Sequence, residues 1–152
     1  MDFFTPTQVS VFSRLILAVL LGSAIGIERT LAHRLAGFRT FAMVSLGACA
    51  FTLIGQAVFE NVVGGAGDPL RVASQIVVGI GFLAGGLIVL NKDTVHGLTT
   101  GAGLWVAGSI GMATGFGLYS IAISVTILTV LIFGLFWHVE QKIVASKHEH
   151  QE

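Results

Sequence analysis

The chain has 152 residues, of which 54% are hydrophobic and only 11% are charged, and its eight Lys and Arg residues balance its eight Asp and Glu residues. A water-soluble domain carries about 25% charged residues, so this chain cannot surround a core with a water-facing surface. The composition excludes an ordinary soluble domain, and the charge balance excludes a nucleic-acid binder. The single cysteine, Cys49, cannot form an internal disulfide, which excludes a disulfide-stapled scaffold. An integral membrane protein remains.

Apolar stretches long enough to cross a bilayer recur along the chain, since a spanning helix needs roughly 20 mostly apolar residues. We predict spanning helices over Val11–Ile27, Phe41–Phe59, Val72–Leu90, Thr100–Thr114 and Leu118–Trp137. The last two come from one uncharged stretch that the turn-forming run Gly115-Phe116-Gly117 divides. The sequence therefore predicts an all-α integral membrane protein, a bundle of about five transmembrane helices over residues 1–140, followed by a polar cytoplasmic tail over residues 141–152.

We interpret the first apolar segment as a retained span rather than a cleaved signal peptide. Asp2 precedes the segment and Arg14 is its only positive charge, so a basic n-region is missing. The run Gly26-Ile27-Glu28-Arg29 at its end is also a poor cleavage site.

Positive charges gather on one side of the predicted bundle, and Lys and Arg are enriched in cytoplasmic loops. The side of the N-terminus carries Arg14 and Arg71. The opposite side carries Arg29, Arg34, Arg39, Lys92, Lys142 and Lys147. This imbalance predicts an N-terminus outside and a C-terminus in the cytoplasm.

Glu28 and Arg39 lie within a turn of predicted membrane boundaries, where ionisable groups are costly unless they pair or line a wet cavity. They either face the bundle interior as part of an ion or partner site, or reach water as headgroup-level anchors. Both interpretations stay open for these two residues. We interpret Arg29 and Arg34 as anchors.

Asp68 and Pro69 are typical of a helix start, because Asp is a good N-cap and Pro is tolerated at the first helical position. We therefore expect a helix to start at Leu70. Arg71 follows in its first turn, where a positive charge opposes the helix dipole. We predict that Arg71 has a carboxylate partner in the folded bundle, and the carboxylates on the same predicted side are Asp68, Glu60 and Asp2.

A run of glycines occupies the third predicted span. Its spacing loosely matches a dinucleotide-binding fingerprint, but that motif needs a strand–turn–helix context, so we reject it. We predict that these glycines pack against neighbouring helices, with Gly22-x-x-x-Gly26 and Gly111-x-x-x-Gly115 as matching surfaces. The alternative is a helix broken at the midplane whose freed carbonyls hold an ion. The predicted packing residues are Gly22, Gly26, Gly79, Gly81, Gly85 and Gly86.

The remaining polar residues give no catalytic pattern. Thr99 and Thr100 at the head of the fourth span either line a polar pocket or act as caps, and Cys49 is expected to be a small buried residue. No histidines have metal-ligand spacing on a helix, and the tail run His148-Glu149-His150 is short. We predict no metal site, no cofactor and no enzymatic activity.

Five clusters in register resemble the N-terminal membrane domain of the MgtC/SapB family, over about residues 14–137. The clusters are Gly26-x-Glu28-Arg29, Ala36-Gly37-Phe38-Arg39-Thr40, Asp68-Pro69-x-Arg71, Gly79-Ile80-Gly81-Phe82-Leu83 and Gly97-Leu98-Thr99-Thr100, followed by Trp105. The chain departs from the common family pattern at Phe38, Ala84, Gly85 and Gly101, by swaps among small or apolar residues. We expect it to lack the C-terminal cytoplasmic domain that many members have.

The resemblance implies a protein of the bacterial inner membrane linked to survival at low magnesium and, in pathogens, to virulence inside phagocytes. It implies a regulator acting on the rotary ATP synthase and on phosphate homeostasis, although the family is often labelled a magnesium transporter. The candidate functional residues are Glu28, Arg39, Thr40, Asp68, Arg71, Thr99 and Thr100.

Two functions therefore compete. A regulator would leave small-residue helix faces free for a membrane partner, such as the ATP synthase or a sensor or transporter. A small carrier or channel for Mg²⁺ would need several inward carboxylates. Only Glu28 and Asp68 qualify, on opposite predicted sides, so we favour the regulator. We also expect a homo-oligomer, with a dimer through the third span favoured, in contact with the lipid bilayer.

Overall fold

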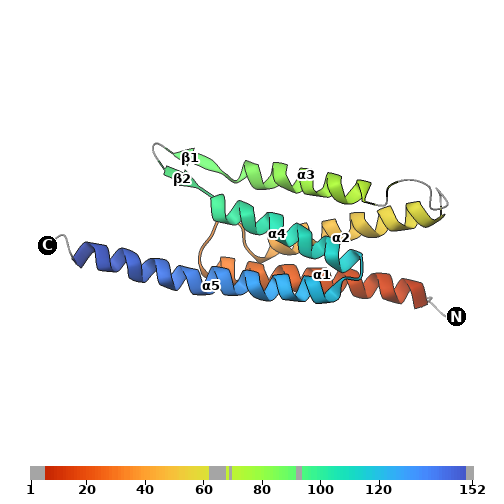
Figure 1. Ribbon diagram of the computed structural model, residues 1–152, viewed down its shortest axis with the longest axis horizontal. Coiled ribbons are helices and arrows are strands. Elements are labelled where there is room, and N and C mark those ends of the chain that lie inside the picture. Colours follow the sequence, from red (N-terminus) through yellow and green to blue (C-terminus); the bar gives the residue numbers. More distant parts are fainter. Residues whose placement is uncertain (1–5, 62–67, 69, 92–93, 150–152) are drawn as a thin grey trace.

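The computed structural model describes the backbone of residues 6–61, 68, 70–91 and 94–149, and the side chains of residues 8–61, 68, 70–91 and 94–136. Five helices run along the long axis of the molecule in alternating directions (Figure 1). Their bounds are α1 Pro6–Leu31, α2 Phe38–Asn61, α3 Arg71–Gly86, α4 Leu98–Gly115 and α5 Tyr119–Glu149, with a hairpin of β1 Val89–Asn91 and β2 Thr94–His96 between α3 and α4.

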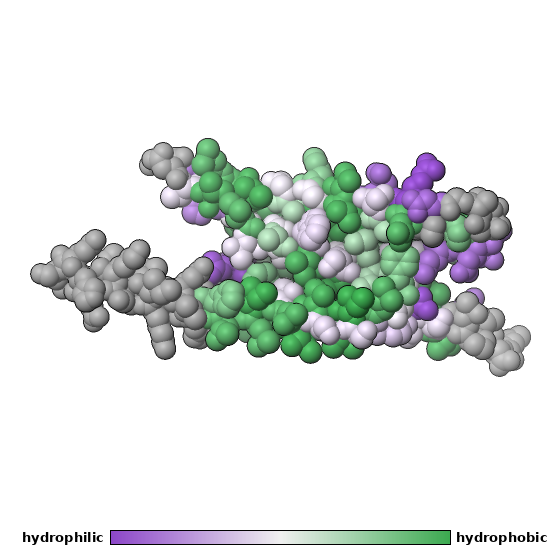
Figure 2. All heavy atoms as spheres, in the orientation of Figure 1, coloured by the Kyte–Doolittle hydropathy of each residue, from purple (hydrophilic) through white to green (hydrophobic). Residues whose placement is uncertain are grey.

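Three of the described helices are long and apolar enough to cross a membrane, over Gln8–Leu31, Phe38–Asn61 and Tyr119–Phe136. The helices α3 and α4 have 16 and 18 residues, which at 1.5 Å per residue gives lengths of about 24 and 27 Å. Figure 2 shows hydrophobic residues along the sides of the bundle and hydrophilic residues gathered toward its two ends. The predicted all-α membrane protein is confirmed, with the short hairpin as an addition.

Helix α4 lies at the centre of the bundle and contacts each of the other four helices. Its central place explains why the most glycine-rich span is also the most buried one. The buried residues of α4 are Thr100, Gly101, Gly103, Leu104, Ala107, Gly108, Ile110, Gly111, Ala113, Thr114 and Gly115. Small side chains let neighbouring backbones approach closely, which is how helices pack inside a bilayer.

The glycine pairs Gly22 and Gly26 of α1 and Gly111 and Gly115 of α4 make close contacts with α2. A Cβ added at Gly22 would lie 2.7 Å from the Phe41 carbonyl oxygen, and one at Gly115 would lie 2.7 Å from Thr52 Cβ. An added Cβ at Gly111 would collide with the Ser45 carbonyl oxygen. The packing surfaces predicted on α1 and α4 are therefore present, and both face α2 rather than α3.

The glycines of α3 have no such role within this chain. No described atom lies within 4 Å of a Cβ added at Gly79, Gly81, Gly85 or Gly86. The inward face of α3 instead carries Ile76, Ile80 and Ala84, spaced one turn apart. At the contact between α3 and α4, the glycine that allows close packing belongs to α4, because a Cβ added at Gly108 would collide with the Ile80 side chain. The predicted packing of α3 through its own glycines is wrong for contacts with the described residues of the chain.

Helix α3 is also shorter than predicted, since it ends at Gly86 rather than Leu90. The glycine pair at its end weakens the helix, and the β-branched residues Ile88 and Val89 that follow favour an extended backbone. The hairpin pairs Val89 with His96, Leu90 with Val95 and Asn91 with Thr94. All six strand residues are exposed.

The division of the long uncharged stretch is confirmed. Helix α4 ends at Gly115, Gly117 adopts the left-handed conformation with φ 77° that favours glycine, and α5 starts at Tyr119. Arg14 of α1 holds this turn, because its Nη1 donates to the Gly115 carbonyl oxygen at 2.8 Å. Helix α5 continues as far as Glu149, through most of the segment predicted as a tail.

We expect Gly111→Ala to destabilise the bundle by about 1–3 kcal/mol, the usual cost of overpacking a filled interface. Gly81→Ala is the matched control, since the site is open and alanine is the better helix former by about 1 kcal/mol. Unfolding of both purified variants in a denaturing-detergent titration measures the difference. Equal unfolding midpoints for the two variants would contradict the close contact between α4 and α2.

Candidate functional site

Arg29 is the only charged residue among the buried residues of the described chain, with 4% of its surface exposed. The other buried polar residues are mostly threonines that donate to a carbonyl one turn back, as Thr52 does to Ala48 at 2.8 Å. Such local bonds make a buried threonine inexpensive, whereas a buried guanidinium needs partners. Our interpretation of Arg29 as a headgroup-level anchor that reaches water is therefore wrong.

The guanidinium of Arg29 joins three helices near one end of the bundle. Its Nη2 donates to Thr100 Oγ1 of α4 at 3.4 Å, and its Nη1 lies 3.7 Å from Glu28 Oε2 on α1. It also stacks on the Phe133 ring of α5, with 4.2 Å from Cζ to the ring centroid. Stacking and an ion pair are both favourable for a desolvated guanidinium.

The packing of α4 against α5 makes room for the aromatic ring that contacts Arg29. A Cβ at Gly103 would lie 2.7 Å from Phe133 Cζ, so this glycine of α4 leaves the space that the Phe133 ring fills. On α5, Phe133 continues the buried stripe of Ala122, Thr126 and Thr129 at helical spacing. The packing of α5 on α4 thus places an aromatic face beside Arg29.

The corner between α1 and α2 fixes the position of Glu28 and Arg29. Thr30 Oγ1 donates to the Gly26 carbonyl oxygen at 2.9 Å and accepts the Phe38 N–H at 3.0 Å. One side chain therefore joins the last turn of α1 to the first residue of α2. Gly37 leaves room for this hydroxyl, since an added Cβ would collide with it.

A polar cavity of about 380 Å³ opens beside Arg29. It lies where α1 ends, where the hairpin returns and where α4 begins. Its lining residues are Arg29, His33, Arg34, Leu35, Val95, His96, Gly97, Leu98, Thr99 and Thr100. We call this cavity the polar pocket.

The structure brings three of the sequence-predicted site residues together at Arg29 and the polar pocket. Thr99 and Thr100 line the polar pocket, and Glu28 contacts Arg29 with 21% of its own side chain exposed. Arg39 is exposed, with its guanidinium 6.0 Å from the Phe38 ring. Thr40 lines a different, apolar cavity between α2 and α3.

Asp68 and Arg71 lie at the opposite end of the bundle, and both are exposed. Helix α3 starts at Arg71 with Leu70 as its N-cap, so Asp68 is not the N-cap that the sequence predicts. Its Oδ1 instead accepts the Leu70 N–H at 2.9 Å. The described residues contain no ion pair to Arg71, and Asp2, one candidate partner, lies outside them.

Sequence reasoning missed Arg29, although a signal was present. Ala18, Gly22 and Ile25 form the buried face of α1, and position 29 continues the same helical spacing. The role of Arg14 at the C-terminal end of α4 was also missed. That role had no local signal, because its acceptor at Gly115 is far away in sequence.

The described residues contain no group of three or more His, Cys, Asp or Glu side chains that could hold a metal ion. Cys49 is buried and unpaired, as expected. The arrangement at the polar pocket combines guanidinium groups, hydroxyls and a helix N-terminus, which are groups that bind anions.

Comparisons with known proteins identify relatives over most of the chain. Residues 15–142 match the MgtC family. The protein named "Protein MgtC" from Brucella abortus is 44% identical over 118 residues, which cover 78% of this chain and 48% of that protein. The Escherichia coli (strain K12) protein named "Putative magnesium transporter YhiD" is 37% identical over 127 residues, which cover 81% of this chain and 59% of that protein.

An uncharacterized protein from Haemophilus influenzae is 38% identical over 133 residues, covering 82% of this chain and 55% of that protein. The chain thus spans about half the length of the curated relatives that it matches. No solved structure matches it. The match over residues 15–142 and the shared identity across the helices show that the chain belongs to the MgtC family.

Proposed function

We propose that the chain is a non-enzymatic regulator in the bacterial inner membrane that serves adaptation to low magnesium and, in pathogens, intracellular survival. It acts through contacts with another membrane complex, such as the ATP synthase. Membership of the MgtC family and a relative named as a magnesium transporter support the link to magnesium. In this proposal, the partner complex binds to a surface formed by α2 and α3.

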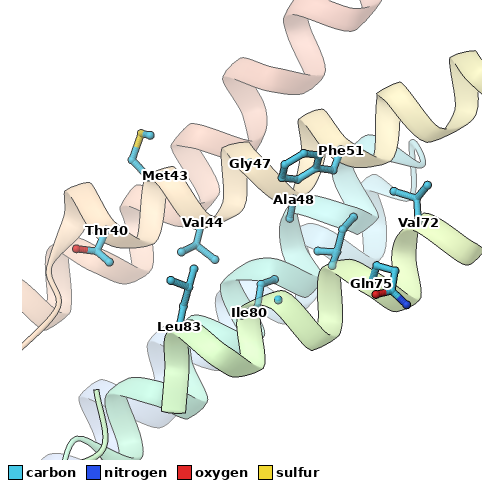
Figure 3. Close-up of a pocket in the computed structure, with 12 residues that line it drawn as sticks. Thr40, Met43, Val44, Gly47, Ala48, Phe51, Val72, Gln75, Ile80 and Leu83 are labelled. Carbon is cyan, nitrogen blue, oxygen red and sulfur yellow. The ribbon is translucent and has the colours of Figure 1, made fainter. Parts of the chain in front are cut away.

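The observation that carries the proposal is an apolar groove of about 610 Å³ between α2 and α3. Figure 3 shows Thr40 and Gln75 toward its two ends, with aliphatic and aromatic side chains between them. Gly47 of α2 and Gly79 of α3 both border the groove, and nothing described lies within 4 Å of a Cβ added at either. We call this feature the lateral groove.

Small residues on an open helix face are suited to another transmembrane helix, because they let its backbone approach closely. On α3, Gly86 lies on the same side as Gly79, whereas Gly81 and Gly85 lie on the opposite side, away from the groove. Since Gly47 and Gly79 pack against nothing described in this chain, contact with a helix of a partner complex would give these two glycines a role. This is the feature that we expected of a regulator.

The face of α3 also suits a second copy of the chain, and we propose a homodimer as the resting state. A dimer through the lateral groove would bury Gly47 and Gly79, which a partner helix would also bury. Binding to the partner complex then competes with dimer formation, and the oligomeric state reports on the same surface.

The orientation that we propose places the polar pocket on the cytoplasmic side. Arg29, Arg34 and Arg39 lie at that end, whereas Arg14 and Arg71 lie toward the other. An excess of arginine in short loops favours the cytoplasm.

A carrier for a divalent cation is the alternative, and the geometry favours it less. Mg²⁺ needs several oxygen ligands and loses its water reluctantly. Glu28 and Asp68 lie at opposite ends of the bundle, and the lateral groove between α2 and α3 is almost entirely apolar. No described arrangement therefore gathers oxygen ligands at mid-depth.

We expect Gly79→Leu to reduce co-purification of ATP synthase subunits from magnesium-starved cells at least severalfold, because leucine fills the lateral groove. Gly81→Leu is the matched control on the same helix, with an equally open site that does not line the groove. Equal recovery with both variants and the wild-type chain would contradict a partner helix in the groove. Loss of dimer in cross-linking, with ATP synthase recovery unchanged, would assign the groove to the second copy.

We expect no Mg²⁺ uptake above empty liposomes from the folded chain reconstituted in proteoliposomes. The described chain offers no path of oxygen ligands, so Glu28→Gln and Asp68→Asn should behave like the wild-type chain. Saturable uptake that disappears in either variant would replace the regulator with a carrier.

A further inference from the structure

The polar pocket has a buried cation with unused hydrogen-bond donors. Only 4% of the surface of Arg29 is exposed, and its Nε has no hydrogen-bond partner in the described structure. Its hydrogen bond to Thr100 is long at 3.4 Å, and its ion pair with Glu28 spans 3.7 Å. A guanidinium carries five N–H donors, and the described structure gives Nη2 an acceptor and leaves Nε without one. A buried guanidinium with a donor left unpaired is costly, and an anion in the pocket would offer this group a further acceptor.

Helix α4 adds further donors at the same place. Gly97 is the N-cap of α4, with φ 87°, and no side chain caps the helix. The first intrahelical bond of α4 begins at the Gly101 N–H, which donates to the Gly97 carbonyl oxygen at 2.8 Å. The N–H groups of residues 98–100 precede this bond and lie beside the pocket. They form the positive end of the helix dipole, which attracts anions.

The charges at the pocket therefore do not balance in the described structure. Arg29 and Arg34 both line the pocket, together with the N-terminus of α4, whereas Glu28 is the one carboxylate in contact with Arg29. Two guanidiniums beside a positive helix end repel one another in a partly desolvated site. An anion between them would relieve this repulsion.

We propose that the polar pocket binds a phosphate group. Arginine forks match phosphate oxygens in a bidentate manner, and helix N–H groups donate to the same ligand. The hydroxyls of Thr99 and Thr100 provide two further donors. This site is separate from the lateral groove, and the proposal does not rest on the partner contact.

Two sources can supply this phosphate chemistry. The pocket lies at one end of the bundle, where the headgroups of anionic phospholipids lie beside the protein and free phosphate reaches it from water. The cavity of about 380 Å³ is roomy enough for a phosphate ester as well as for the free ion. The experiment separates the two sources.

The test uses the purified chain in nanodiscs of phosphatidylcholine, with radiolabelled inorganic phosphate in equilibrium dialysis. A second set of nanodiscs contains phosphatidylglycerol, and native mass spectrometry measures which lipid stays bound. Arg34→Gln removes an exposed cation that lines the pocket, and Arg39→Gln removes an exposed cation that does not. Arg29→Lys keeps the buried charge but loses the fork, with circular dichroism as a check of folding.

We expect saturable binding that Arg34→Gln and Arg29→Lys each weaken by about tenfold or more, which is typical for loss of a charge-assisted hydrogen bond. Arg39→Gln should leave binding unchanged. Binding of inorganic phosphate in phosphatidylcholine discs assigns the site to the free ion. Selective retention of phosphatidylglycerol alone, weakened by Arg34→Gln, assigns it to a lipid headgroup. The proposal is overturned if neither ligand binds, or if Arg39→Gln weakens binding as much as Arg34→Gln.

Discussion

The close approach of α4 to its neighbours is the constraint on which the rest of the structure depends. Gly111 and Gly115 bring the α4 backbone against α2, and Gly108 receives Ile80 of α3. A helix so placed is covered by its neighbours over most of its surface, with Ala102 and Trp105 exposed on one side. Its length of 18 residues suffices because it does not have to face lipid along its whole surface. The same placement brings the N-terminus of α4 beside Arg29, while the lateral groove between α2 and α3 stays open.

The buried Arg29 is tolerated because three helices contribute to its surroundings. Glu28 offsets its charge, Phe133 offers an aromatic face and Thr100 accepts a hydrogen bond. None of these contacts is short, and Glu28 Oε2 also lacks a hydrogen-bond partner in the described structure. Buried ion pairs of this kind contribute little to stability when their donors and acceptors stay unsatisfied. The cluster is therefore better explained by a ligand than by a need for stability.

The sequence predicts the helices and the turn at residues 115–117 because both depend on local patterns of apolar residues and glycine. It does not predict which helix a glycine faces, since Gly22 and Gly79 look alike until the neighbours are known. The end of α3 was missed because an apolar run such as residues 87–90 suits a strand as well as a helix. The burial of Arg29 depends on Thr100 and Phe133, which are distant in sequence.

The lateral groove and the polar pocket differ in chemistry and in their position along the bundle. They share no lining residue, and one is almost entirely apolar whereas the other combines arginines with the N-terminus of α4. An apolar groove along the side of the bundle can take only a group that belongs in hydrocarbon, such as a helix. A cationic pocket at the end takes only a group that stays at headgroup depth or in water. Helix α3 borders the groove and α4 begins at the pocket, and the hairpin connects these two helices. The two cavities are therefore close in sequence, although one has an apolar lining and the other a cationic one.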